Sequence, residues 1–315
     1  MMASVGPAVQ RRRLQVELRQ LRERQSKTQR EVASDIGWSL SKLIRIETGQ
    51  VGLSLSDLRA LLAEYGVGDP EVRSRLEALA REGRKQQWGR YRDVLNPDFL
   101  AYLGFEGSAA TIRQAEPQVL PGLLQTSRYA RAVIAGVGGA EVSSSTVDRQ
   151  VEVRMKRQEV FKREAPPEMF FILDESALRR PVGGRAVMVD QLNHLARMAA
   201  LRHVHLRVIP LERGAHPGLR GAFVLLELPG LPGSSNRSRG AMLFLESSQT
   251  SLITKDNAAA IATYEQEFKF LQTLALPEGK TVKLITDIAA SLRRAALLKR
   301  RRRRLYSNGH RGGHR

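Results

Sequence analysis

The chain has 315 residues, of which 42% are hydrophobic and none is cysteine, and its formal net charge is +19 with a sequence pI near 11.0. This length exceeds one average domain and the apolar content can fill two cores, so we expect two domains. The absence of cysteine excludes disulfides, a thiolate nucleophile and cysteine-bound zinc, and the positive surplus favours a polyanionic partner, either nucleic acid or an anionic membrane.

The N-terminal residues predict a flexible basic arm over 1–13, with three consecutive arginines from Arg11. No uninterrupted apolar run of signal or membrane length follows, so a cytoplasmic protein is expected. Leu14, Leu18 and Leu21 then recur at helical spacing and predict a first amphipathic helix. Its basic residues either contact phosphates or form a solvated outer face.

Two short helices joined by a tight turn are predicted over residues 28–49. Thr28 and Glu31 have the spacing of a capping box, which satisfies free amides at a helix start. Gly37 follows the apolar stripe of this helix and permits the positive φ that ends it. Ser39 is placed to cap a second helix, which Gly49 can close.

The second of these helices separates its side chains into two faces at 100° per residue. Leu43 and Ile46 point toward a core. The opposite face carries Ser41, Ile44, Arg45 and Thr48, with Leu40 on the boundary. Because arginine can bind guanine bidentately and apolar groups can meet thymine methyls, this face predicts contact with the major groove of DNA.

Two more helices complete the first predicted domain, residues 14–82. Ser54 with Asp57 forms a second capping pattern, and Asp69-Pro70 opens the last helix. The polar and breaker-rich residues that follow predict a linker over 83–97.

An α+β domain is predicted over residues 98–296. Strand-like runs joined by turn-rich loops alternate with helical segments, which indicates a mainly antiparallel sheet flanked by helices. The expected strands are MFFILD, VHLRVIPL, AFVLLEL, AMLFLE and SLIT, after an extended piece at 112–119. The Gly-rich stretch 136–140 lacks a Walker or dinucleotide pattern and is expected to be a connector, and the loop 228–240 is expected to be exposed and mobile.

A last helix is expected at about 278–298, running into a basic tail, residues 297–315, that is predicted to be disordered because like charges repel. Non-specific attachment to DNA is the favoured role of this tail. A solvated tail without function is the alternative, and membrane attachment is weaker because no lipidation signal accompanies the charges.

A family resemblance covers about residues 14–290. The segment TQREVASDIGWSLSKLIRIETG resembles the phage-repressor type, or xenobiotic-response-element family, of helix-turn-helix. Four ordered motifs resemble the C-terminal domain common in actinobacterial regulators: YLGFEGSAATIRQAEPQVLPGLLQT, RQVEVRMKRQEVF, LDESALRRPVGG and RGAHPGLRGAF. The resemblance implies an oligomerising, signal-responsive second domain and a small protein partner encoded nearby.

Enzymatic chemistry finds little support in the sequence. The histidines form no metal-binding pattern, and His203 and His205 lack a carboxylate at ligand spacing, so no metal and no cofactor are expected. A self-cleaving repressor would need the Ala135-Gly136 bond and a serine activated by lysine, and Ser247, Ser248, Ser251 and Lys255 are only neighbours in sequence. The motif at 173–184 and the stretch HPGLRG could bind a ligand, but internal ion pairs and a turn are the favoured interpretations.

These observations predict a sequence-specific DNA-binding transcriptional regulator that forms a homodimer and has no catalytic residues. Its expected DNA-binding residues are Gln29, Ser39, Leu40, Ser41, Lys42, Ile44, Arg45 and Thr48. Ser41 and Arg45 are assigned to base edges, Gln29, Lys42 and Thr48 to the backbone, and Ser39 to capping with a phosphate contact. A non-specific architectural DNA-binding protein is the competing hypothesis.

Overall fold

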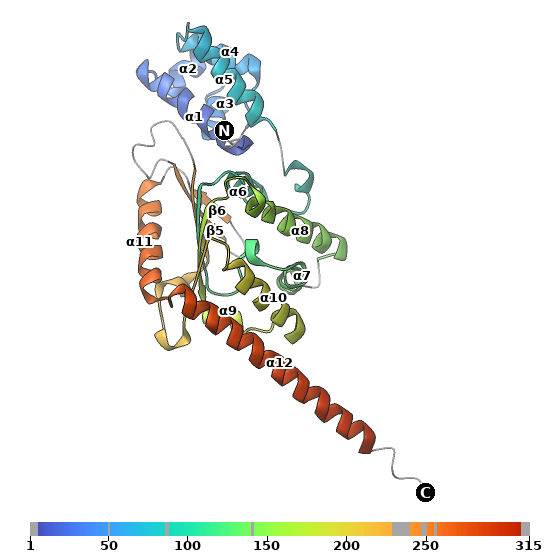
Figure 1. Cartoon of the computed structure of the whole chain (residues 1–315). Coiled ribbons are helices and arrows are strands. Elements are labelled where there is room, and N and C mark those ends of the chain that lie inside the picture. The colour runs from blue at the N-terminus through green and yellow to red at the C-terminus, as the bar shows by residue number, and fades with distance from the viewer. Residues whose placement is uncertain are drawn as a thin grey trace. The chain divides into compact units, whose positions relative to one another are not determined.

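The computed structural model describes residues 6–49, 51–85, 88–139, 142–228, 240–246, 251–254 and 257–309. It forms two compact units (Figure 1). The first comprises Met1–Ala110, Leu226–Met242 and Ile253–Ala258, and the second comprises Thr111–Leu225, Leu243–Leu252 and Ala259–Arg315.

Helices make up most of the described part of the first unit. They are α1 (Pro7–Arg24), α2 (Gln29–Asp35), α3 (Leu40–Thr48), α4 (Leu55–Glu64), α5 (Pro70–Gly83) and α6 (Pro97–Glu106), with a short 3-10 helix at Gly89–Tyr91. Helices α1 to α5 confirm the expected all-α helix-turn-helix fold. Their shared core contains Leu14, Leu18, Leu43, Ile46 and Leu58, all of which are at least 97% buried.

The prediction of a flexible arm over 1–13 is wrong from Pro7 onward, because α1 begins there. Proline at the first helical position costs no hydrogen bond, since that amide has no intrahelical partner. Val9 is fully buried, and Arg11 donates to the Gly83 carbonyl from Nε at 3.1 Å and from a terminal nitrogen at 2.7 Å. These tertiary contacts, which the basic sequence does not reveal, hold the segment helical.

A six-stranded mixed sheet has the order β3-β2-β1-β4-β5-β6. Its strands are β1 (Thr111–Glu116), β2 (Glu168–Asp174), β3 (Val204–Ile209), β4 (Phe223–Glu227), β5 (Ala241–Glu246) and β6 (Ser251–Thr254). Strands β1, β2 and β3 are parallel to one another, and the remaining pairs make the sheet mostly antiparallel, as predicted. The parallel part was not expected; it follows from helical crossovers between β1 and β2 and between β2 and β3.

The helices of the second unit lie on both sides of this sheet (Figure 1). Helices α7 (Ser127–Gly138), α8 (Ser144–Arg157) and α10 (Arg185–Met198) lie on one side, and α11 (Ala258–Leu274) lies on the other. The rings of Tyr264 and Phe268 in α11 meet Phe223 of β4 edge-on, at centroid distances of 4.9 and 6.3 Å. Such aromatic contacts attach α11 to the sheet.

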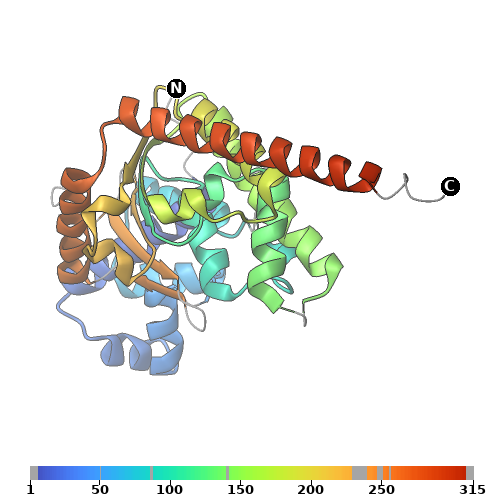
Figure 2. The same ribbon diagram turned by 90° about the horizontal axis from the view of Figure 1, so that it is seen from below.

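Strand β3 is an edge strand whose open side is covered by the start of α12 (Glu278–Gly309). The Val208 carbonyl accepts from the Leu276 amide at 2.8 Å, and the Val208 amide donates to the Thr281 hydroxyl at 3.2 Å. Figure 2 shows α12 passing beside α10 and continuing beyond it. This cover removes an exposed edge that could pair with another strand.

One predicted loop and the predicted tail differ from the structure. Helix α7 includes most of the Gly-rich stretch, to Gly138, and α12 remains helical to Gly309 although disorder was expected from 297. Arginine, lysine and leucine all favour helix, so the basic run extends the helix before it. Most of the loop 228–240 and residues 310–315 lie outside the described residues.

None of the described helices combines the length and apolar character that crossing a bilayer requires.

The buried side chain of Gln191 joins α10 to the start of α7. Its Oε1 accepts from the Thr126 amide at 2.6 Å, and its Nε2 donates to the Leu124 carbonyl at 2.7 Å. We expect Gln191→Leu to lower the free energy of unfolding by about 1–3 kcal/mol, because both backbone groups lose their partner. Urea denaturation measures this loss, and Asn193→Leu on the same helix is the control. An equal effect of the two substitutions would contradict the role assigned to Gln191.

Candidate nucleic-acid interface

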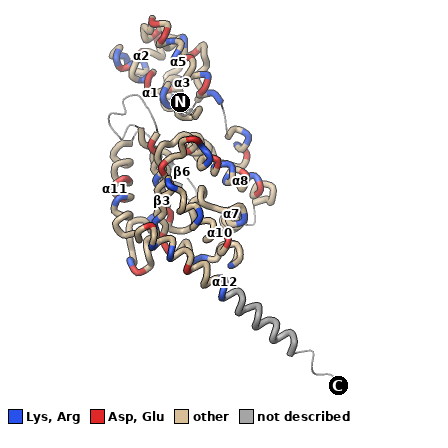
Figure 3. The backbone as a smooth tube through the Cα atoms, in the orientation of Figure 1, with Lys and Arg blue, Asp and Glu red and all other residues tan. Residues whose placement is uncertain are grey.

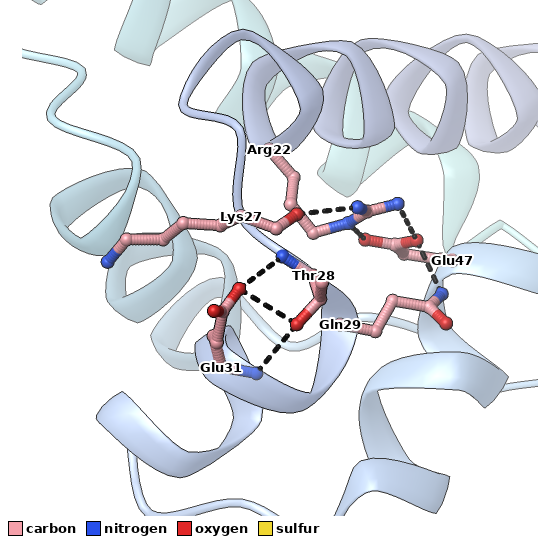
Figure 4. Close-up of polar contacts among 6 residues, drawn as sticks. All are labelled: Arg22, Lys27, Thr28, Gln29, Glu31 and Glu47. Atoms are coloured by element: carbon pink, nitrogen blue, oxygen red, sulfur yellow. Dashed lines mark hydrogen bonds and ion pairs between the residues drawn. The ribbon is translucent and has the colours of Figure 1, made fainter.

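Helix α2 begins with the predicted capping box, which Figure 4 shows. The Glu31 amide donates to the Thr28 hydroxyl at 3.2 Å, and the Thr28 amide donates to the Glu31 carboxylate at 2.7 Å. The backbone hydrogen bond from Thr28 is the largest cause that lowers the pKa of Glu31. Two otherwise unpaired amides are satisfied, so the start of α2 is defined locally.

The turn between α2 and α3 depends on Gly37, whose φ is +67°. The Trp38 amide then donates to the Ala33 carbonyl at 2.7 Å, which closes the turn. The Ser39 hydroxyl accepts from the Lys42 amide at 3.2 Å and caps α3, while Gly49 ends it with a φ of +80°. The turn and both ends of α3 therefore lie at the residues that the sequence predicts.

Helix α3 presents the predicted division of faces. Leu43 and Ile46 are buried, Ser41, Arg45 and Thr48 are exposed, and Leu40 and Ile44 are half-buried. Arg45 makes no hydrogen bond or ion pair with the described residues. The hydroxyl of the exposed Thr48 donates to the Ile44 carbonyl at 2.8 Å.

A buried carboxylate behind this face joins three helices (Figure 4). Glu47 of α3 is 1% exposed and accepts from Arg22 of α1 at 2.7 and 3.1 Å and from Gln29 of α2 at 2.7 Å. Arg22 also donates to the Lys27 carbonyl at 2.8 Å, and its bond to Glu47 raises the pKa of Arg22. The sequence did not lead us to expect a structural role for Glu47. Its position four residues after the buried Leu43 places it on the same face of the helix and could have indicated its burial.

Gln29 and Lys42 already have protein partners. The side-chain amide of Gln29 donates to Glu47. The phosphate contact predicted for Gln29 stays a prediction, and it requires either that this hydrogen bond breaks or that the backbone amide of Gln29 makes the contact. The Lys42 ammonium lies 2.8 Å from Asp57 and 3.7 Å from the centroid of the Trp38 ring. Burial raises the pKa of Asp57, but hydrogen bonds from Lys42 and Ser54 outweigh it and hold the pKa below its ordinary value.

The motif at 173–184 forms internal contacts in the second unit. The Asp174 carboxylate accepts from the Ser176 amide at 2.8 Å and lies 3.2 Å from His216 Nε2. Glu175 is 3% exposed and accepts from Arg179 at 2.6 Å and from the Leu211 amide at 3.1 Å. Thus the internal ion pairs that we favoured for this motif are present, and Asp174 joins it to the HPGLRG stretch.

The histidine pair does not share one environment. His205 lies between the carboxylates of Glu278 at 3.1 Å and Glu168 at 3.2 Å, and its ring stacks on Phe170 with a centroid distance of 4.6 Å. His203 lies beside Phe161 instead. In the described part of the chain, no group of three or more histidine, aspartate or glutamate side chains has an arrangement that could hold a metal ion.

Comparison with protein families gives two matches. Residues 99–287 match a domain of unknown function, DUF5753, and residues 13–76 match a helix-turn-helix domain. No curated protein and no solved structure matches the chain. The helix-turn-helix match covers all of α2 and α3 and indicates a DNA-binding regulator.

The Glu47 cluster predicts an unequal response to mutation. Glu47→Ala leaves the partly buried Arg22 without its counter-charge and should lower the free energy of unfolding by up to about 3 kcal/mol. The exposed pair Glu82 with Lys85 is a control, for which Glu82→Ala should cost at most about 1 kcal/mol. Urea denaturation followed by tryptophan fluorescence measures both. Similar small losses would show that Glu47 does not hold the helices together.

Proposed function

Because the chain belongs to the DUF5753 family and carries a helix-turn-helix domain before that region, we propose that it is a sequence-specific transcriptional regulator of the phage-repressor type. It acts as a homodimer in the cytoplasm, at the nucleoid, with α3 as its recognition helix. The DUF5753 region mediates oligomerisation and responds to a signal or to a small protein partner.

The exposed face of α3 carries this proposal. An exposed guanidinium and hydroxyl stand on a short helix whose opposite side is held by Leu43, Ile46 and Glu47. Because the buried side chains that hold this helix are already ordered, the helix can enter the major groove without ordering them further. The absence of a described partner for Arg45 leaves its five donors available for a guanine edge.

The roles of the other residues follow from their positions. Ser41 contacts a base edge beside Arg45, and Leu40 and Ile44 supply apolar contact to thymine methyls. Ser39 and the start of α2 at Gln29 meet the backbone, since helix N-termini bind phosphate. Thr48 meets the backbone at the other end of α3. Lys42 contacts phosphate by exchanging its ion pair with Asp57 for one with DNA.

A homodimer of this kind presents its two recognition helices about 34 Å apart, one helical turn of DNA. The expected operator is therefore an inverted repeat on one side of the duplex. Footprinting at moderate salt tests this arrangement, and protected palindromes are the expected result.

Non-specific DNA coating is the second candidate, and the distribution of charge favours it. Basic and acidic residues occur together on the helices of the first unit (Figure 3), whereas residues 293–304 contain eight Lys or Arg and no Asp or Glu. Such a run neutralises phosphates without selecting a sequence. Uniform protection in the footprint would support this candidate over the regulator.

Self-cleavage is not part of the proposed mechanism. The Ala135-Gly136 bond lies within α7, where the backbone is helical. Prolonged incubation at alkaline pH should leave the chain at its full length on a denaturing gel. The appearance of two discrete fragments, lost on replacing Gly136 by Pro, would instead establish a self-cleaving repressor.

Two substitutions on α3 separate base recognition from backbone contact. Arg45→Ala should cost about 1–3 kcal/mol in operator binding and relax the preference at one base pair. Lys42→Ala should weaken operator and random DNA by similar factors and reduce the salt dependence by about one ion.

Fluorescence anisotropy on both DNAs over a range of salt measures these effects, and Arg73→Ala, an exposed arginine of α5, controls for loss of charge alone. Equal losses on operator and random DNA for both α3 variants would refute the division of roles.

A further inference from the structure

A small cavity of about 120 Å³ lies within the second unit. It is bounded by β2 and β3, by Gln272 near the end of α11 and by Glu278, the first residue of α12. Its volume is well below the roughly 300–1,000 Å³ of drug-sized sites, so it can hold only a molecule of a few heavy atoms. The proposed DNA contact uses none of its lining residues.

The positive charge of this cavity has no counter-charge. Arg207 of β3 is half-buried, and within the described part of the chain its side chain makes no hydrogen bond or ion pair. Gln272 of α11 is also half-buried, and its side-chain amide has no partner among the described residues either. A guanidinium group binds a planar carboxylate bidentately, and a primary amide can donate a further hydrogen bond to it. These two side chains therefore suit a ligand carboxylate.

A carboxylate lines the same cavity without pairing with that guanidinium. One oxygen of Glu278 lies 3.1 Å from Nδ1 of His205, and its other oxygen has no partner among the residues that the structure describes. The second ring nitrogen of His205 lies 3.2 Å from Glu168, so both nitrogens of this ring are occupied. The oxygen of Glu278 that lacks a partner can accept hydrogen bonds from an ammonium group, which is a charge-assisted contact.

These opposite charges decide what kind of ligand fits. A simple anion would meet the carboxylate of Glu278, and a simple cation would meet the guanidinium of Arg207. A zwitterion can pair with both groups at once, because it carries a carboxylate and an ammonium group.

The cavity also has an apolar wall on the sheet. In the parallel pairing of β2 with β3, Phe170 lies opposite His205 and Ile172 lies opposite Arg207. Side chains in register and two positions apart lie on one face of a sheet, so these four side chains share a face. The Phe170 ring is stacked on His205 with a centroid distance of 4.6 Å. Phe170 and Ile172 therefore offer apolar contact to a short side chain of the ligand.

We propose that this cavity binds a small α-amino acid of about the size of alanine. Its carboxylate binds to Arg207 and Gln272, and its ammonium group binds to Glu278. Its short side chain lies against Phe170 and Ile172. This binding does not depend on the proposed contact with DNA.

Isothermal titration of the full chain with L-alanine tests the proposal. We expect one site per chain. Propionate lacks the ammonium group and ethylamine lacks the carboxylate, and each should bind at least about tenfold more weakly than alanine, since each loses a charge-assisted contact. L-Tryptophan, which exceeds the volume of the cavity, should not compete with alanine.

Three variants assign the contacts. Arg207→Gln should weaken alanine binding at least tenfold, and Glu278→Gln should abolish the preference for alanine over propionate. Arg197→Gln changes an exposed arginine of α10, on the opposite side of the sheet from α11, and should leave binding unchanged. Thermal melting followed by circular dichroism checks that each variant is folded, and the comparison of the three ligands on the unaltered chain needs no variant.

Failure of alanine to bind at tens of millimolar would overturn the proposal. Propionate or ethylamine binding as tightly as alanine would also overturn it, because the site would then recognise a simple anion or a simple cation. Unchanged alanine binding in both Arg207→Gln and Glu278→Gln would place the ligand elsewhere and refute this site.

Discussion

The buried carboxylate of Glu47 is the interaction on which the candidate interface depends. It accepts hydrogen bonds from Arg22 of α1 and Gln29 of α2 while belonging to α3, so one side chain specifies the positions of three helices. A carboxylate at 1% exposure is costly unless its charge is paired and its lone pairs are filled. Arrangements of the helices that separate Glu47 from Arg22 are therefore disfavoured.

This constraint explains how so short a helix can present a defined surface. Helix α3 spans only Leu40–Thr48, and an isolated helix of that length is marginal in water. Its Ser39 cap, its left-handed Gly49 and the Glu47 cluster supply order that helix propensity alone cannot. Ser41 and Arg45 thereby remain available to meet DNA, whereas Gln29, Ser39, Lys42 and Thr48 already have contacts within the protein.

The second unit uses buried polar contacts in a similar way. Asp174 ends β2, caps α9 (Glu175–Arg179) and meets His216, while Glu175 holds both Arg179 and the Leu211 amide. Residues of two separate motifs are thus joined through one strand end. Their polar character, which resembles that of a binding site in sequence, is accounted for here by internal hydrogen bonds.

Local chemistry in the sequence determined the helix-turn-helix. Thr28, Glu31, Gly37, Ser39 and Gly49 specify helix ends through contacts within a few residues, and the spacing of Leu43 and Ile46 identifies the buried face. Most strands of the second unit were also identified, because their apolar runs and turn-rich boundaries are local properties.

Only the tertiary structure decided the remaining features, because they depend on residues far apart in the chain. The Arg22 pair with Glu47 spans 25 positions and the bond from Arg11 to Gly83 spans 72, so neither the helical start at Pro7 nor the role of Glu47 follows from local pattern. The parallel order of β1, β2 and β3 likewise depends on how crossovers pack.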